Sequence, residues 1–227
     1  MDRQTSRISL TSFFLSFIAG YCDTVTFVSG DAIFSAHVTG NFVVFAAHLL
    51  SESSNASWIK LITFPVFVTA VIIGGRLTEK AQERYLVLLT ESVLLMLCGI
   101  AAVLLPAFLS LEERLCTYLI VMLCVFAMGM QNAFGKLFAK ETHGPTTMMT
   151  GNVTQAALDI STLFSKGFVT EVLSKQRLFN LLVTIGGFLS GCLVGALLGK
   201  IWGLSTLFLP GLGLLLCYLI NRKSNTA

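Results

Sequence analysis

The sequence predicts an all-α multi-pass membrane protein with six transmembrane helices and two short re-entrant helices in an inverted 3+3 repeat. Of its 227 residues, 55% are apolar and only 12% are charged, whereas a soluble globular domain has about 25% charged residues. The apolar residues form unbroken runs close to the length of a membrane-spanning helix, without the alternation of a β-barrel strand. The whole chain, 1–227, is therefore predicted to be a single membrane domain.

Six apolar runs are long enough to cross the hydrocarbon core of a bilayer, at about 1.5 Å per helical residue. Two further apolar stretches, 38–50 and 148–164, are shorter or interrupted, the second by Asp159. If these two stretches also cross, the chain has eight spanning helices instead of six. The six predicted spans are 8–28, 58–75, 85–108, 115–137, 178–199 and 201–220.

The distribution of lysine and arginine favours six spans, because cytoplasmic loops carry an excess of basic residues. With six spans and the N-terminus inside, 12 basic residues lie inside and 3 outside, whereas eight spans give 9 and 6. Each short stretch is therefore predicted to be re-entrant, so that it enters and leaves the membrane on the same side. Both chain termini are predicted to be cytoplasmic. In the six-span arrangement the inside residues are Arg3, Arg7, Arg76, Lys80, Arg84, Lys136, Lys140, Lys166, Lys175, Arg177, Arg222 and Lys223, and the outside residues are Lys60, Arg114 and Lys200.

Three short segments recur in the same order, which indicates an internal duplication with repeat one at 8–108 and repeat two at 115–220. Because each half has three spans, the second half enters the membrane in the opposite sense, so the repeat is inverted. Transporters and some channels have such repeats, with the binding site near the bilayer midplane. The matching segments are Gly20-Tyr21-Cys22-Asp23 with Gly129-Met130-Gln131-Asn132 at an offset of 109, Thr39-Gly40-Asn41 with Thr150-Gly151-Asn152 at 111, and Gly74-Gly75 with Gly186-Gly187 at 112.

Each Thr-Gly-Asn triplet opens a short apolar helix that is predicted to start within the membrane. A threonine or asparagine oxygen can cap free backbone N–H groups, and glycine lets the chain turn. The inverted topology brings the two helix N-termini towards each other, and their partial positive charge attracts anions or the oxygen atoms of polar solutes. The alternative is that the triplets only satisfy backbone groups.

Asp23 lies five residues before the end of the first predicted span, where a carboxylate is costly, about 2.5 to 3.5 kcal/mol at a helix centre. Its repeat counterpart, Asn132, is neutral, so Asp23 is expected either to bind a proton or cation or to cap a helix end. Gln131 and Asn132 form an amide pair that can bind a polar substrate. Glu91 and Asp159 are expected to be structural. The predicted substrate-binding residues are Asp23, Thr39, Gly40, Asn41, Gln131, Asn132, Thr150, Gly151 and Asn152.

The sequence contains no G-x-S-x-G, H-E-x-x-H or phosphate-loop motif, so no enzymatic activity, catalytic residue or cofactor is predicted. The six cysteines form no C-x-x-C pair, and His37 and His143 have no second ligand nearby in sequence, so no metal site is predicted. The basic residues sort by membrane side, so no nucleic-acid partner is expected. The expected partners are the lipid bilayer and a small molecule or ion.

Glycine recurs at every fourth position from Gly187 to Gly199, which produces a smooth stripe where another helix backbone can approach closely. The stripe can pack within the chain or between two copies of it. The sequence therefore leaves open whether the protein forms a homo-oligomer.

The segments Gly20–Asp23 and Thr39–Asn41, together with Ala127–Ala133 and Met149–Asn152, resemble the hallmark segments of the YoaK-like family of bacterial multi-pass membrane proteins. The resemblance extends from about Ile8 to Ile220. This family is a domain of unknown function, often labelled a permease, so the resemblance implies a protein of the bacterial cytoplasmic (inner) membrane without naming a substrate.

The repeat and the polar residues lead to the expectation of a transporter or channel for a small polar or anionic solute, bound at the midplane between the repeats. The alternative is a membrane protein without transport, in which the polar interior serves assembly, sensing or structure.

Overall fold

The computed structural model describes residues 3–50, 57–81, 86–108, 112–139, 142–143, 145–165 and 168–225. Within these ranges every regular element is a helix, as predicted. Tyr85, the first residue of the third predicted span, lies outside the described residues. The elements are α1 (Arg3–Ser29), α2 (Gly40–Leu49), α3 (Ile59–Ala81), α4 (Leu86–Phe108), α5 (Glu113–Leu137), α6 (Met149–Ser165), α7 (Phe168–Trp202), the 3₁₀ helix η1 (Gly203–Leu207) and α8 (Phe208–Asn225).

Five helical stretches in the described ranges are long and apolar enough to cross a membrane, which supports the prediction of a helical membrane protein. Four of them lie in α1, α3, α4 and α5. The fifth, Ser174–Leu219, has 46 residues, about twice what one crossing needs. It is divided by η1, whose first residue, Gly203, has a φ of +62°. Neither α2 nor α6 is among the five.

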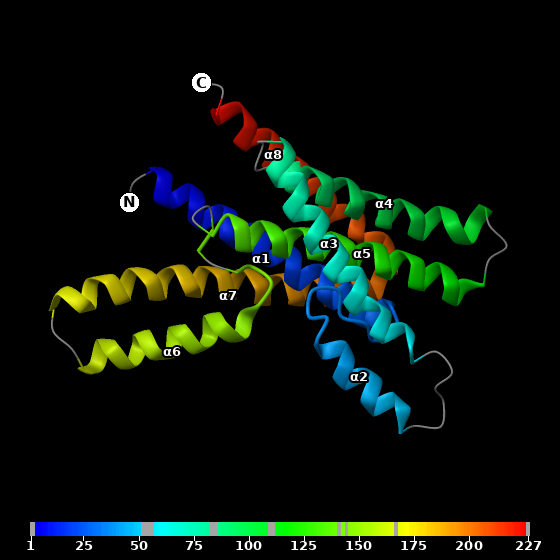
Figure 1. Cartoon of the computed structure of the whole chain (residues 1–227), viewed down its shortest axis with the longest axis horizontal. Coiled ribbons are helices and arrows are strands. Elements are labelled where there is room, and N and C mark those ends of the chain that lie inside the picture. Colours follow the sequence, from blue (N-terminus) through cyan, green and yellow to red (C-terminus); the bar gives the residue numbers. More distant parts are fainter. Residues whose placement is uncertain are drawn as a thin grey trace.

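The long helices lie side by side in a bundle (Figure 1). Helices α1, α4 and α7 run in one direction, and α3, α5 and α8 run in the other. The start of α1 and the end of α8 therefore lie at the same end of the bundle. Helices α2 and α6 both begin near its middle and run towards opposite ends.

The helices pack in a defined set of pairs: α1 on α7, α3 on α5, α4 on both α5 and α8, α2 on α3, and α6 on α7. The core lies where α1, α4, α5 and η1 meet, and its fully buried side chains include Ile18, Leu95, Met128 and Leu207. Large apolar side chains are exposed on the outer faces of the helices, as a surface that faces lipid requires.

The glycine stripe on α7 lies directly against the backbone of α1. A Cβ atom at Gly187 would lie 2.5 Å from the carbonyl oxygen of Phe13, and one at Gly195 would lie 2.7 Å from that of Tyr21. In folded proteins, a Cβ atom essentially never lies within 3.0 Å of a heavy atom of another residue to which it is not bonded. These positions therefore require glycine. Of the two alternatives that the sequence left open for the stripe, the structure therefore shows packing within the chain.

The close approach of α1 and α7 predicts a position-specific effect of alanine substitution on α7. A Cβ atom at Gly191 would overlap the carbonyl group of Phe17, whereas one at Gly186 meets nothing within 4 Å. We expect Gly191→Ala to lower the free energy of unfolding by about 1–3 kcal/mol and Gly186→Ala to change it by no more than about 0.5 kcal/mol. Thermal unfolding of the purified protein measures both, and equal losses would contradict the packing.

Candidate functional site

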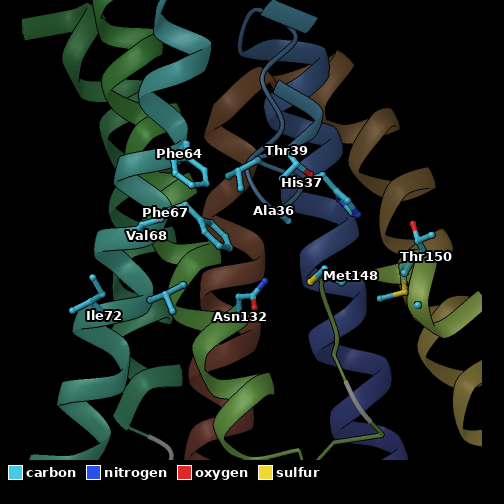
Figure 2. A pocket seen from close by; sticks show the side chains of 14 residues that line it. Ala36, His37, Thr39, Phe64, Phe67, Val68, Ile72, Asn132, Met148 and Thr150 are labelled. Carbon is cyan, nitrogen blue, oxygen red and sulfur yellow. The ribbon is translucent and has the colours of Figure 1, made fainter. Parts of the chain in front are cut away.

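A cavity with a volume of about 490 Å³ lies between the starts of the two short helices (Figure 2). This volume falls in the range of about 300 to 1,000 Å³ that is usual for small-molecule sites. The residues that line it come from the connection before α2, from α3 and α5, and from the start of α6. They are Ala36, His37, Val38, Thr39, Phe64, Phe67, Val68, Val71, Ile72, Asn132, Met148, Met149, Thr150 and Gly151.

One wall of the cavity is apolar and belongs to α3. Its residues recur every three or four positions, so they share one face of the helix. Figure 2 shows four of these side chains, Phe64, Phe67, Val68 and Ile72, on the same side of the cavity. Sequence reasoning missed this wall, because an apolar stripe on a membrane helix has the same pattern whether it faces lipid or a cavity.

The opposite side of the cavity is more polar. It carries His37 and Thr39 from the connection before α2, Asn132 from α5 and Thr150 from the start of α6. The starts of both short helices thus face one cavity. His37 was noted in the sequence beside the first triplet, but nothing there predicted that it reaches the cavity.

The predicted site residues divide into two groups. Thr39, Asn132, Thr150 and Gly151 line the cavity, and Asp23 contacts it through His37. The remaining four do not line it. They are Gly40, Asn41, Gln131 and Asn152.

Asp23 is buried and binds the connection that precedes α2. Its Oδ1 accepts hydrogen bonds from the backbone N–H groups of Ala36 (2.7 Å) and His37 (3.2 Å). Its Oδ2 lies 2.7 Å from Nδ1 of His37. The carboxylate therefore holds the backbone three to four residues before α2 and orients the imidazole. Asp23 therefore binds backbone of the connection and does not cap the first turn of α2 in these contacts.

The Asp23 carboxylate also changes the acid–base behaviour of His37, which lies outside the membrane-spanning segments. The hydrogen bond to Asp23 raises the pKa of His37, and partial burial opposes that shift. A raised pKa favours a protonated imidazole at the edge of the cavity near neutral pH.

Asn41 ties the connection to the helix that follows it. It is fully buried, its Oδ1 accepts from the N–H of Phe34 (2.8 Å), and its Nδ2 donates to the carbonyl oxygen of Phe34 (2.8 Å) and to Oγ1 of Thr63 (3.0 Å). The predicted capping of α2 by its own triplet is wrong. Thr39 makes no side-chain cap, because the N–H groups of residues 40–42 bond to carbonyl groups three residues earlier.

Asn152 has the corresponding contact in the second repeat. Its Nδ2 donates to the carbonyl oxygen of Pro145 at 2.9 Å, seven residues earlier in the chain, the same spacing as between Asn41 and Phe34. Both triplet asparagines are thus buried and bind backbone. The Thr-Gly-Asn pattern therefore marks a structural clamp on the connection before each short helix.

The two amide side chains of α5, Gln131 and Asn132, have different roles. Gln131 is buried, and its Nε2 donates to the carbonyl oxygen of Leu15 (2.7 Å) and to Oγ1 of Thr146 (3.0 Å). Asn132 lines the cavity, and its Nδ2 donates to Oγ1 of Thr147 at 2.9 Å. Only Asn132 is therefore placed to contact a solute in this cavity.

The two helix starts differ in charge. A carboxylate, Asp23, binds the connection just before α2, whereas its predicted repeat counterpart, Asn132, is a neutral amide that binds Thr147 just before α6. The residue that corresponds to Asp23 at the second connection is thus a neutral amide, which does not offset the partial positive charge at the N-terminus of α6 as a carboxylate would. The polar side of the cavity thus combines the start of α6 with the imidazole of His37, the amide of Asn132 and the hydroxyl of Thr150.

The raised pKa of His37 predicts a pH-dependent contribution to stability. A group whose pKa rises on folding stabilises the protein below its unfolded-state pKa, 6.5 for histidine, and this contribution is lost as the pH rises through the folded-state value. The free-energy difference between wild type and His37→Gln should therefore be largest near pH 6 and shrink above neutral pH. Because the imidazole is 35% exposed, we expect no more than about 1 kcal/mol.

His143 provides a control of opposite sign. It contacts the hydroxyl of Ser9 instead of a carboxylate, and burial lowers its pKa. The wild type should therefore lose stability relative to His143→Gln as the pH falls. Thermal unfolding of both variants between about pH 6 and about pH 9 measures the two trends, and a pH-independent difference for His37→Gln would contradict the ion pair.

Comparison with known proteins places the chain in a family but supplies no activity. Neither a curated protein nor a solved structure matches it. A family match, in contrast, extends over residues 11–220, which include nearly all of the two predicted repeats and every residue of the cavity. The chain belongs to the family described as "Protein of unknown function (DUF1275)".

Proposed function

We propose that the protein is a membrane transporter or channel for a small solute that has an apolar body and an anionic or hydrogen-bond-accepting group. The observation that carries this proposal is the cavity of about 490 Å³ in the middle of the bundle, lined by the starts of both short helices. Helices that begin inside a membrane leave polar backbone at that depth, which is tolerated only where it is buried in protein or lines a wet cavity.

The helix pairing supports six crossings in an inverted repeat. The duplication relates α1 to α5, α2 to α6, α3 to α7 and α4 to α8. Under this relation the contact of α1 with α7 becomes that of α5 with α3, the contact of α2 with α3 becomes that of α6 with α7, and the contact of α4 with α8 maps onto itself. A pseudo-two-fold axis between the repeats accounts for this pattern.

The chemistry of the cavity supports the class of solute. The α3 wall is apolar, and the opposite side has the amide of Asn132, the hydroxyl of Thr150 and the imidazole of His37. The one carboxylate at this side, Asp23, already accepts three hydrogen bonds from the connection before α2. A short-chain carboxylate fits this combination, because its chain can contact α3 and its charge the start of α6.

The basic residues favour a cytoplasmic location for both ends of the chain, in a bacterial inner membrane. Cysteine labelling tests the number of crossings. In a cysteine-free background, Glu112→Cys should react with a membrane-impermeant maleimide in intact cells, and Glu79→Cys only after permeabilisation. Both side chains are exposed at helix ends. Eight crossings would reverse the two results and remove the inverted repeat.

Thermal stabilisation by a homologous series of carboxylates, from acetate to hexanoate, tests the solute class. Only a ligand that binds the folded state stabilises it by mass action. Each buried CH₂ group contributes about 0.8 kcal/mol, or about fourfold in Kd. We therefore expect stabilisation to increase along the series, and the corresponding amides and alcohols to stabilise less.

Two threonines one turn apart on α6 provide a matched pair of variants. Thr150 lines the cavity, whereas Thr154 does not and bonds to the carbonyl oxygen of Thr150. Thr150→Val should weaken carboxylate binding by about two- to tenfold, the usual value of one hydrogen bond, and Thr154→Val should leave it unchanged. Equal effects, or no stabilisation by any member of the series, would overturn the proposed solute site.

A further inference from the structure

Glu91 is a buried carboxyl group without a partner. Three acidic side chains are buried in the described part of the chain, and Asp23 and Asp159 both accept hydrogen bonds, from His37 and Arg177 respectively. Glu91 is fully buried in α4, and neither of its carboxyl oxygens has a hydrogen-bond partner. The structural role expected from the sequence does not account for an acid that binds nothing.

The surroundings of Glu91 are apolar. It shares the buried face of α4 with Leu88 and Leu95. Cys98 lies seven residues further on, on the same face, and its Sγ contacts the carbonyl oxygen of Ile120 at 3.7 Å. This contact places the face against α5, inside the main core of the bundle.

The titratable groups near Glu91 are thiols. On α8, residues 208–216 include no titratable side chain, and neither does η1. On α3, the charged residues near the connection to α4, Arg76 and Glu79, are exposed. No cation therefore faces the carboxyl group from the described residues. The groups that interact with it electrostatically are Cys124 on α5 and Cys22 on α1.

The energetics favour the neutral acid in this conformation. An ionised carboxylate without a cation costs several kcal/mol in an apolar interior, so Glu91 carries its proton here. Even a neutral polar group that lacks a hydrogen bond costs about 1–3 kcal/mol. An apolar side chain would stabilise this conformation better, so the carboxyl group indicates a second conformation in which water reaches it.

We propose that Glu91 is a proton-binding site, protonated in the conformation described here and exchanging its proton with water when the bundle opens. Resting on the proposed function, this inference identifies the proton as the ion coupled to solute movement. Helix α1 connects the two sites, because Cys22 interacts with Glu91 and the next residue, Asp23, holds His37 at the cavity. A rearrangement of α1 thus reaches both.

Infrared spectroscopy of the protein in lipid nanodiscs, without solute, tests the site directly. We expect the C=O stretching band of a protonated carboxyl group at neutral pH, and its loss in Glu91→Gln, which replaces the neutral acid by a group of similar size. Asp159→Asn is the matched control: Asp159 is equally buried but paired with Arg177, so the band should persist. In D₂O the band should shift as the proton exchanges.

The proposal fails if the band is absent at neutral pH, if it persists in Glu91→Gln, or if it never shifts in D₂O. Should Glu91→Gln not fold, Glu91→Asp keeps the test decisive, because the band must then move instead of disappearing. These outcomes are independent of transport. If the Glu91 band is present but no carboxylate stabilises the protein, the proposed solute is overturned and the proton site stands. If carboxylates stabilise the protein but the Glu91 band is absent, only the proton site is overturned.

Discussion

The close contact between the backbones of α1 and α7 is the constraint on which the rest of the bundle depends. Gly187 and Gly195 admit carbonyl groups of α1 where any side chain would overlap. Gly20 on α1 makes the reciprocal approach, to the carbonyl group of Phe188. In lipid, helices gain no hydrophobic free energy by association, so small residues that allow close van der Waals contact determine which helices pair. Since α1 and α7 lie in different halves of the chain, this contact also joins the two halves.

The connections before α2 and α6 are held in place by side chains of the packed helices. Residues 30–39 are tied to α1 by Asp23 and to α3 through Asn41 and Thr63. The second connection is tied to α5 by Gln131 and Asn132. Asp23, Asn41 and Asn152 bind backbone groups of these connections, and Gln131 and Asn132 bind threonine hydroxyl groups in the second one. Non-helical backbone at membrane depth requires such partners. The clamps leave the helix starts facing the cavity, and His37 and Thr150 at its edge.

The two halves of the proposed repeat differ at residues that carry charge. The carboxylate of Asp23, which binds the connection before α2, has a neutral counterpart in Asn132, which binds the connection before α6. Glu91 on α4 adds a second difference, because α8, the proposed counterpart of α4, contains no acidic residue between Phe208 and Asn225. A pseudo-symmetric scaffold with asymmetric charges can bind one solute in one orientation, which a symmetric site cannot do.

The sequence by itself determined the helical membrane class, the approximate bounds of the long helices and the landmarks of the duplication, because these follow from local hydropathy and spacing. It also identified Asp23, Thr39, Asn132 and Thr150 near the cavity. Only the tertiary structure decided what these residues contact. Whether an asparagine caps a helix or clamps a distant loop, whether an apolar face meets lipid or a cavity, and whether a buried acid has a partner depend on groups far apart in the chain.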